Sequence, residues 1–322
     1  MPRRGLRGGH VQTVASFLIQ RRFNLPAPEA RFIEVAPGVS VLCHCHWQAD
    51  RTKPLTIIIV HGLEGSSESQ YSLGVAEKAL AAGMNVIRYN QRNCGGTDAM
   101  APVLYHSGLS EDIAAVSREL IERDRISQLA LVGFSMGGNL VLKLAGEWGA
   151  QGPPQFRAVA ACCPAMDLAA SADALHEPAN RLYEQFFLFS LRRRMIRKAS
   201  LFPSHFDVDR MRGMRTLRDF DHQVTAYYCG FGSADDYYAR AAASNVVDKI
   251  SMPTLIVHAA NDPFIRILPE TRTKIAANRN INFLEVEDGG HCAFVGTRNG
   301  HDDGFWAERQ IVNFLREILR EL

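Results

Sequence analysis

The segment LALVGFSMGGNLVLKLA, residues 129–145, decides the fold expected for this chain. Its first four residues are apolar, as in a buried strand, and the residues after Gly137 indicate a helix. Ser135 stands at the junction, between Gly133 and Gly137. A serine on such a sharp turn projects its oxygen above the sheet, and side chains at the two glycine positions would crowd the turn. The segment therefore predicts an exposed nucleophile, the alternative being a glycine-rich loop with an incidental serine.

The composition restricts the class of protein. The chain has 322 residues, of which 47% are apolar, so it can bury a large core in one or two domains. Its formal charge of +2 gives no indication of a nucleic-acid partner. No apolar run approaches the ~20 residues of a membrane span, and the basic residues 1–7 precede a segment too polar for a signal peptide. We therefore expect a cytoplasmic protein without an integral membrane span.

The cysteines point the same way. There are seven, an odd number without the CxxC spacing of metal sites, as expected for free thiols in a reducing compartment. Only the run Cys43-His44-Cys45-His46 suggests a metal. Alternation along a strand would put its two cysteines on one face and its two histidines on the other. We therefore predict no metal and no cofactor.

Strands and helices alternate along most of the chain. Apolar, β-branched runs predict eight strands, at residues 31–35, 39–46, 55–60, 84–89, 128–132, 157–162, 254–259 and 281–286. Helices are expected at residues 10–22, 70–82, 109–123, 136–148, 269–277 and 304–320. This alternation predicts an α/β fold with a mainly parallel, twisted eight-stranded sheet that is flanked by helices.

The alternation stops at Pro164. Residues 165–245 are helical in propensity and rich in arginine and aromatic residues, with no clear strand. We expect a single domain whose core comprises residues 31–164 and 246–322. An inserted helical lid then occupies residues 165–245, and an N-terminal extension, residues 1–30, packs on the core. Such a lid would lie at the carboxyl ends of the strands, where open α/β sheets bind ligands.

A serine nucleophile needs a base, and the base needs an acid that orients it. When the serine lies on a strand-to-helix turn of this kind, the acid and then the base follow it along the chain. Asp262 and His291 each follow a predicted strand, and two glycines before the histidine free its loop. We predict Asp262 as the acid and His291 as the base. Asp288 is the alternative acid, and His301 is the weaker alternative base.

The negative charge that develops on the attacked carbonyl oxygen needs hydrogen-bond donors. In such folds the donors are the backbone amide after the nucleophile and one in the loop after the third strand. These positions are Met136 and Leu63. The helix that begins at Met136 also directs its positive end toward the developing charge. We expect His61, at the start of the loop, to brace it rather than react.

Several short motifs are spread along the chain, namely His10-Val11-Gln12-Thr13, residues 61–67, residues 90–96, residues 105–108, residues 133–139, Asp219-Phe220-Asp221, Asn261-Asp262-Pro263 and Gly289-Gly290-His291. Together they resemble the YheT-like and embryogenesis-associated (AB hydrolase 4) branch of the α/β-hydrolases. The resemblance covers nearly the whole chain. It implies a carboxylic ester hydrolase with Ser135, Asp262 and His291 as the catalytic triad. Outside the triad, we expect residues 92–96 to shape the loop beneath the site and Asp112 to cap the following helix.

The predicted lid leaves two interpretations open. Its segment Phe186-Phe187-Leu188-Phe189 precedes a group of basic residues, namely Arg192, Arg193, Arg194, Arg197 and Lys198. One interpretation is an apolar acyl groove with a basic rim that meets fatty acyl chains or an anionic lipid surface. The other is a helix with a core face and a solvated charged face. Aromatic residues between 227 and 238 either line a pocket or seat the lid.

The function predicted from these residues is that of a serine carboxylesterase. It would hydrolyse short- to medium-chain acyl esters, its small-molecule substrates, through an acyl-enzyme. An acyltransferase or ester synthase that uses an alcohol would need the same triad. A lipase or phospholipase, and a non-catalytic ligand-binding protein with this fold, are further alternatives. Dehalogenase and epoxide hydrolase chemistry is disfavoured because those enzymes have an aspartate where this chain has Ser135.

Overall fold

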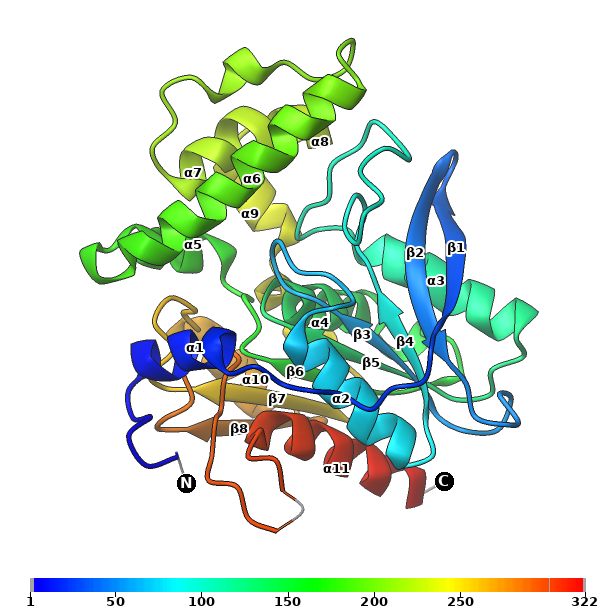
Figure 1. The fold of residues 1–322 in the computed structure, drawn as a ribbon. Helices are drawn as coiled ribbons and strands as arrows, with labels where there is room; N and C mark the ends of the chain where they lie inside the picture. The colour runs from blue at the N-terminus through cyan, green and yellow to red at the C-terminus, as the bar shows by residue number, and fades with distance from the viewer. Residues whose placement is uncertain (1–2, 301, 321–322) are drawn as a thin grey trace.

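The computed structural model describes residues 3–300 and 302–320 (Figure 1). The remaining residues are Met1 and Pro2 of the basic N-terminus, His301, Glu321 and Leu322. The alternative base His301 therefore lies outside the described residues.

One sheet of eight strands forms the centre of the molecule, in the order β1-β2-β4-β3-β5-β6-β7-β8. The strands are β1 (Glu29–Ala36), β2 (Val39–His46), β3 (Thr56–Val60), β4 (Asn85–Tyr89), β5 (Leu129–Phe134), β6 (Phe156–Cys162), β7 (Thr254–Ala259) and β8 (Ile281–Val286). β1 and β2 form an antiparallel hairpin, and β2 pairs antiparallel with β4. All other neighbouring strands are parallel. The predicted fold class is confirmed.

Helices cover both faces of the sheet. On one face lie α2 (Gln70–Ala81) and α11 (Trp306–Arg320), drawn in front of the sheet in Figure 1. The other face carries α3 (Ser110–Arg123), α4 (Met136–Trp148) and α10 (Pro269–Ala277). Along β3, Ile57 and Ile59 face the first pair of helices, while Ile58 and Val60 face the second group. Strands buried on both faces have continuous apolar sequences, which is why the sheet could be predicted.

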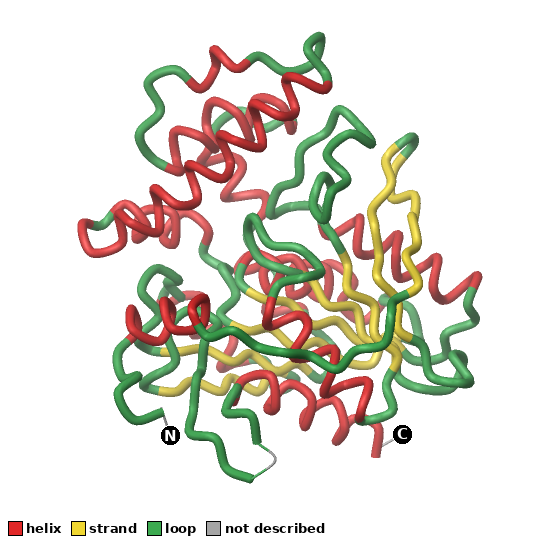
Figure 2. Tube along the Cα trace, in the orientation of Figure 1, coloured by secondary structure: helices red, strands yellow, loops and turns green. Residues whose placement is uncertain are grey.

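Between β6 and β7 the chain leaves the sheet and forms a layer of helices that we call the cap. It comprises α5 (Leu168–His176), α6 (Arg181–Leu201), α7 (Leu217–Phe220), a π-helix (Asp221–Ala226), α8 (Tyr227–Cys229) and α9 (Ala234–Ala241). The cap stands apart from the two helical layers and lies over one edge of the sheet (Figures 1 and 2). Its apolar core also contains Phe264 and Ile265, which follow β7. The cap is therefore seated on the loops at the carboxyl ends of the strands.

The N-terminal helix α1 (Gly9–Leu18) lies against the loop that follows β8. Gln12 is buried, and its side-chain amide donates a hydrogen bond to the Val295 carbonyl and accepts one from the Val295 amide. The helix ends at Leu18 rather than near residue 22, because the backbone becomes extended at Ile19. Among the described residues, no helix combines the length and the apolar character that a membrane crossing requires.

Candidate active site

Ser135 lies at the junction of β5 and α4 in a strained backbone conformation, with φ 54° and ψ −118°. Its amide donates a hydrogen bond to the Cys162 carbonyl (2.9 Å), and its carbonyl accepts one from the Asn139 amide. A side chain at Gly133 would collide with the backbone of Gly137. The two glycines are thus required by close approach of the backbone, and strain of this kind at a non-glycine residue is typical of functional sites.

His291 lies in the loop after β8, with its ring between Ser135 and Asp262. Its Nε2 atom is 3.0 Å from Ser135 Oγ, and its Nδ1 atom is 2.8 Å from Asp262 Oδ2. The ring packs at 4.4 Å, centroid to centroid, against Phe264. The structure therefore joins the three predicted residues in one hydrogen-bonded chain.

Asp262 follows β7, and its side chain is fully buried. Its Oδ1 atom accepts hydrogen bonds from the amides of Phe264 (3.1 Å) and Ile265 (2.9 Å). Burial would raise the pKa of this carboxyl, but the His291 ring and the Ile265 amide outweigh burial and hold the pKa below its usual value. Asp262 is therefore a carboxylate whose free oxygen orients His291.

The alternative acid, Asp288, has other partners. It accepts hydrogen bonds from the Gly8 amide and from the Asn261 side chain (2.7 Å). The other side-chain atom of Asn261, Oδ1, accepts from the amides of Gly289 and Gly290. Asp288 and Asn261 thus fix the loop that carries His291 without touching its ring.

Thr13 of α1 supports the same loop, a role that the sequence did not reveal. Its hydroxyl accepts a hydrogen bond from the His291 amide (2.8 Å) and donates one to the Gly9 carbonyl. Gly290, with φ 58°, packs directly against α1. The motif at residues 10–13 was the signal from which a role for this helix could have been inferred. Helix α1 and the His291 loop are far apart in the sequence, so no local pattern indicates that they meet.

The loop after β3 runs beside the nucleophile. A Cβ atom at Gly62 would lie 3.1 Å from Ser135 Cβ. No acceptor within the described part of the chain binds the amide of Leu63 or of Met136. Since Met136 opens α4, its amide is also one of the unpaired donors of a helix N-terminus. Both amides are therefore available to a ligand at Ser135.

Three side chains brace this loop, namely the buried His61 and Tyr105 and the half-buried Tyr71. Tyr71 accepts a hydrogen bond from the Gly62 amide, and Tyr105 accepts one from the Glu64 amide, both at 2.9 Å. His61 Nδ1 is 2.8 Å from the Gly62 carbonyl, and burial lowers the pKa of His61 to about 4. A neutral histidine held in this way serves as a brace, as expected from the sequence.

The cap also holds the loop. Arg194 of α6 donates a hydrogen bond to Glu64 (2.8 Å), forms an ion pair with Asp98 (3.2 Å) and hydrogen-bonds the Asn93 carbonyl. Lys198 is buried and donates hydrogen bonds to Asn93 and to the Asp98 carbonyl. The interpretation of a wholly solvated charged face is therefore wrong for these two residues.

The expected helix cap at Asp112 is also wrong. Asp112 lies within the first turn of α3, and both of its carboxylate oxygens accept hydrogen bonds from Arg92, at 2.6 and 2.5 Å. The residue before the helix, Leu109, makes no side-chain cap. Asp112 therefore anchors the loop of residues 92–96 instead of the helix end.

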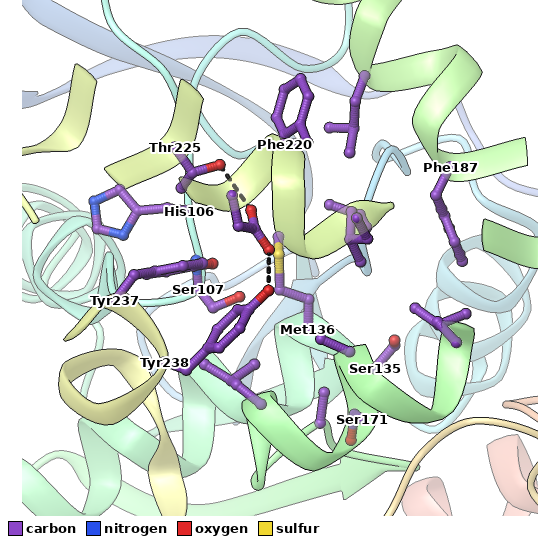
Figure 3. A pocket seen from close by; sticks show the side chains of 18 of the residues that line it. His106, Ser107, Ser135, Met136, Ser171, Phe187, Phe220, Thr225, Tyr237 and Tyr238 are labelled. Atoms are coloured by element: carbon purple, nitrogen blue, oxygen red, sulfur yellow. Dashed lines mark hydrogen bonds between the residues drawn. The ribbon is translucent and has the colours of Figure 1, made fainter. Parts of the chain in front are cut away.

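Two cavities meet at Ser135. The first, the cap cavity, lies between the cap and the sheet and is lined mainly by apolar side chains, including Leu175, Leu191, Met195 and Phe220 (Figure 3). The second, the α1 cavity, is lined by residues of α1, α2, α6 and the His291 loop. Ser135, Leu63 and Phe187 line both cavities, whereas His291 lines only the second. Of the aromatic residues left open in the lid, Tyr237 and Tyr238 line the cap cavity.

Two groups of side chains near the site could share a metal ion. They are Cys162, Cys163 and Cys292, and Cys163, His258 and Asp262. Asp262 already binds His291 and two amides, and burial raises the pKa of all three thiols well above the usual value. The geometry at Ser135 is complete without either group.

Comparisons with known proteins agree with the resemblance predicted from the sequence. The chain is 29% identical to "Putative esterase YheT" of Escherichia coli, over 99% of this chain and 93% of that protein. It is 26% identical to the human phospholipase ABHD3, over 81% of this chain and 62% of that protein. It is also 26% identical to the embryogenesis-associated protein EMB8 of Picea glauca, over 78% and 53%. The chain thus spans less than two thirds of the last two relatives.

Solved structures share the fold. The esterase Pf2001 of Pyrococcus furiosus superposes with a TM-score of 0.60 at 15% identity, over 92% of this chain and 93% of that chain. Est1E of Butyrivibrio proteoclasticus gives 0.57 at 18% identity, over 90% and 99%. A family model described as the alpha/beta hydrolase fold matches residues 56–296. The matched region includes the strand-to-helix turn at Ser135, and the chain belongs to the alpha/beta hydrolase fold family.

Proposed function

We propose that this protein is a serine carboxylesterase that hydrolyses acyl esters of short to medium chain length. Ser135 is the nucleophile, His291 the general base and Asp262 the acid that orients the base. The observation that carries the proposal is the hydrogen-bonded chain from Ser135 Oγ through both nitrogens of His291 to Asp262. The esterase names of YheT, Est1E and Pf2001 support it.

The hydrogen-bonded chain of Ser135, His291 and Asp262 supports acylation of the serine. His291 Nε2 removes the proton of Ser135 as its oxygen attacks the ester carbonyl. Asp262 accepts a hydrogen bond from the Nδ1–H group and so keeps Nε2 unprotonated and able to act as the base. The carbonyl oxygen becomes negative and receives hydrogen bonds from the Leu63 and Met136 amides, an interaction whose loss costs about 3–4 kcal/mol in comparable enzymes.

Collapse of the tetrahedral intermediate breaks the ester bond. His291 returns its proton to the departing alkoxide, which leaves as an alcohol, and the acyl group stays on Ser135. Water then attacks the acyl-enzyme with His291 again as the base, and the acid is released. No metal or cofactor takes part in these steps.

The two cavities suggest how the ester lies in the site. The alkoxide must reach His291 to receive its proton, so the alcohol portion belongs in the α1 cavity, which His291 lines. The acyl portion then enters the cap cavity, whose apolar side chains suit a hydrocarbon chain. We therefore assign acyl recognition to the cap, which would act as the predicted lid.

Exposed apolar residues lie on α1 and α6, two of the helices that line the α1 cavity, and Phe17 and Phe186 are part of its lining. On α1 they include Phe17 (68% exposed) and Leu18 (74%), and on α6 Phe186 (58%) and Phe189 (66%). We propose that they make peripheral contact with a lipid surface that supplies esters. Co-sedimentation with phosphatidylglycerol vesicles tests this. Binding should weaken in Phe186→Ser with Phe189→Ser, and equal binding by wild type and variant would exclude the contact.

The thiols suggest where the protein acts. All seven cysteines are free, and Cys162, Cys163 and Cys292 lie close together without a disulfide. We propose a cytoplasmic location, since a reducing compartment keeps such neighbours as thiols. Labelling with a thiol reagent in intact and lysed cells tests it, and a disulfide among these three residues in freshly isolated protein would argue against it.

A series of p-nitrophenyl esters from acetate to decanoate tests the proposed esterase. Wild type should hydrolyse them and should be labelled by a fluorophosphonate probe, whereas Ser135→Ala should lose both properties. Ser204→Ala, on the exposed surface of the cap, is the matched control and should retain both. Hydrolysis by Ser135→Ala would overturn the mechanism.

A further inference from the structure

The cap cavity has one polar side within its apolar lining. Tyr238, Thr225, Tyr237 and His106 gather on that side, and Phe187 and Ser135 lie on the other (Figure 3). Two dashed lines in Figure 3 run from Thr225 and Tyr238 to one carboxylate, which belongs to Asp221. A carboxylate in an acyl cavity is unexpected if the acyl chain is purely hydrocarbon, because burial of an acid is costly.

Asp221 keeps acceptor capacity that no group in residues 3–300 or 302–320 uses. Its Oδ1 atom accepts a hydrogen bond from the Thr225 hydroxyl (2.8 Å), and its Oδ2 atom accepts one from the Tyr238 hydroxyl (2.7 Å). A carboxylate has about four acceptor positions, so these two bonds leave others unused. Within the described chain no basic side chain forms an ion pair with Asp221, because the nearby Arg218 is paired with Asp173 and Asp235.

The backbone at Asp221 is also unusual. It begins the π-helix Asp221–Ala226, a conformation that is rare in proteins and frequent at functional sites. The motif Asp219-Phe220-Asp221 contains a second acid with a clear structural role. Asp219 completes a capping box with Thr216 at the start of α7. Asp221 caps no helix and instead lines the cavity.

A second polar group from the sheet domain faces the same space. Ser107 lies in the loop of residues 105–108, and its amide donates a hydrogen bond to the Tyr237 hydroxyl (2.9 Å). Its own hydroxyl lies beside the Tyr237 hydroxyl and also lines the cavity. A hydroxyl both donates and accepts, so a ligand hydroxyl could donate to Asp221 and accept from Ser107.

We propose that Asp221, Thr225, Tyr238 and Ser107 form a polar subsite for an acyl chain that carries a hydroxyl group. The preferred substrates are then esters of hydroxy acids, and Asp221 is the residue that determines this specificity. The inference rests on the proposed function, because it assumes that the acyl group enters the cap cavity.

The expected selectivity follows from desolvation. A plain acyl chain that fills the cavity displaces water from Asp221 and gives nothing in return, whereas a hydroxyl restores a hydrogen bond to a charged acceptor. Sites built to bind a hydroxyl discriminate strongly against analogues that lack one. The hydroxyl must lie at the chain position that reaches Asp221, so the preference should appear at one chain length.

The test uses pairs of p-nitrophenyl esters in which a hydroxyl replaces a terminal methyl group. The pairs are ω-hydroxyhexanoate with heptanoate, and ω-hydroxyoctanoate with nonanoate. Wild type should favour the hydroxy ester of one pair by about 10- to 100-fold in kcat/KM. Asp221→Leu should reverse that preference through KM, and Asp221→Asn, which keeps the shape of the side chain, should reduce it. Asp209→Leu, on the exposed surface of the cap and away from the cavity lining, should leave it unchanged.

Two outcomes would overturn the subsite. One is a ratio near one for both pairs in wild type, and the other is an equal loss of both esters in the two Asp221 variants. Hydrolysis of the plain esters, lost in Ser135→Ala, would then leave the esterase intact while the subsite fails. If no ester is cleaved, the esterase fails, and the subsite is still tested by calorimetric binding of ω-hydroxyoctanoate and nonanoate to wild type. Equal affinities in that measurement would reject it.

Discussion

At the scale of single residues, His291 depends on partners from three parts of the chain. Asp262 accepts a hydrogen bond from Nδ1, the Ser135 hydroxyl donates one to Nε2, and the Thr13 hydroxyl accepts one from the backbone amide. The carboxylate decides which ring nitrogen carries the proton. An uncharged amide at position 262 could hold the ring in place with the wrong nitrogen protonated.

Asp262→Asn should therefore lower kcat by about four orders of magnitude with little change in KM, as found when the orienting acid of a comparable triad is changed to its amide. Ester hydrolysis at neutral pH measures the effect. Asp288→Asn is the matched control, because Asp288 binds Gly8 and Asn261 rather than the ring. Its kcat should stay within about tenfold of wild type. A larger loss in the control would exchange the roles of the two acids.

We expect the ionised side chain of Asp221 to lower the free energy of unfolding. Burial raises its pKa to about 6, against roughly 4 in an unfolded chain. Between these values the folded state holds a proton that the unfolded state has lost, so the free energy of unfolding falls as pH rises through this window. Above about pH 6 the full penalty remains.

Asp221→Asn, which cannot ionise, should be more stable than wild type by about 3 kcal/mol well above pH 6 and should lose this gain below about pH 4. Urea unfolding across this range measures it. Asp209→Asn, at an exposed position of the cap, should show no such pH-dependent gain. If Asp221→Asn is less stable at every pH, the carboxylate supports the cap instead of burdening it.

The sequence predicted Ser135 more firmly than its acid. The turn that carries Ser135 is specified locally, by a strand, two glycines and the start of a helix within residues 129–137. Asp262 and Asp288 both follow strands, and their loops are neighbours, joined through Asn261. Which carboxylate meets His291 depends on the loop conformation, which long-range packing determines. The hydrogen bond between Thr13 and the His291 amide could not be predicted for the same reason.

At the scale of elements, the loop after β3, which carries Leu63 and Glu64, is held by contacts from separate layers of the molecule. Tyr105 precedes α3, and its hydroxyl donates to Glu64 (2.6 Å). Arg194 of α6 binds Glu64 from the cap, and its guanidinium lies 5.3 Å from the Tyr105 ring centroid. Since Glu64 adjoins Leu63, the cap reaches a proposed oxyanion donor through a single ion pair.

Arg194→Gln should lower the free energy of unfolding by about 1–2 kcal/mol, because it removes a charged partner that Glu64 and Asp98 share in a half-buried site. It should also reduce kcat by about tenfold, since the Leu63 amide loses support. Chemical unfolding and ester hydrolysis report the two effects. Arg193→Gln is the matched control, because Arg193 is exposed, and it should change neither quantity. An unchanged kcat in a destabilised Arg194 variant would limit the contact to a structural role.

The orientation of helix α6 could not be predicted from its sequence. Lys198 is buried while Phe189 is 66% exposed, which reverses the usual preference of each residue type. One face of α6 packs on the cap core, with Leu188 and Met195, and another meets the loops of the sheet domain. Periodicity identifies an apolar face, but it cannot identify a polar face that is buried by loops from elsewhere in the chain.

At the scale of the whole molecule, the cap and the sheet make one cavity that neither could form alone. Leu175 and Leu217 line it from the cap, while Met136 and Leu104 line it from the sheet domain. The sheet was predicted because its central strands are mostly apolar, β3 being a continuous apolar run after Thr56. The cavity was not, since its shape depends on how two independently patterned layers are placed on each other.

This arrangement gives the last prediction. Ala172 of α5 is buried and lines the cap cavity, so Ala172→Phe should fill part of the space proposed for the acyl chain. The kcat/KM for octanoate and decanoate esters should fall by about 10- to 100-fold, while that for acetate should stay near wild type, because steric exclusion grows with chain length. Ala170→Phe, on the same helix but away from the cavity lining, is the matched control and should leave the profile unchanged. A uniform loss across all esters would indicate damage to the fold. An unchanged profile in Ala172→Phe would mean that the acyl chain lies in the α1 cavity, and the assignment of the two cavities would have to be exchanged.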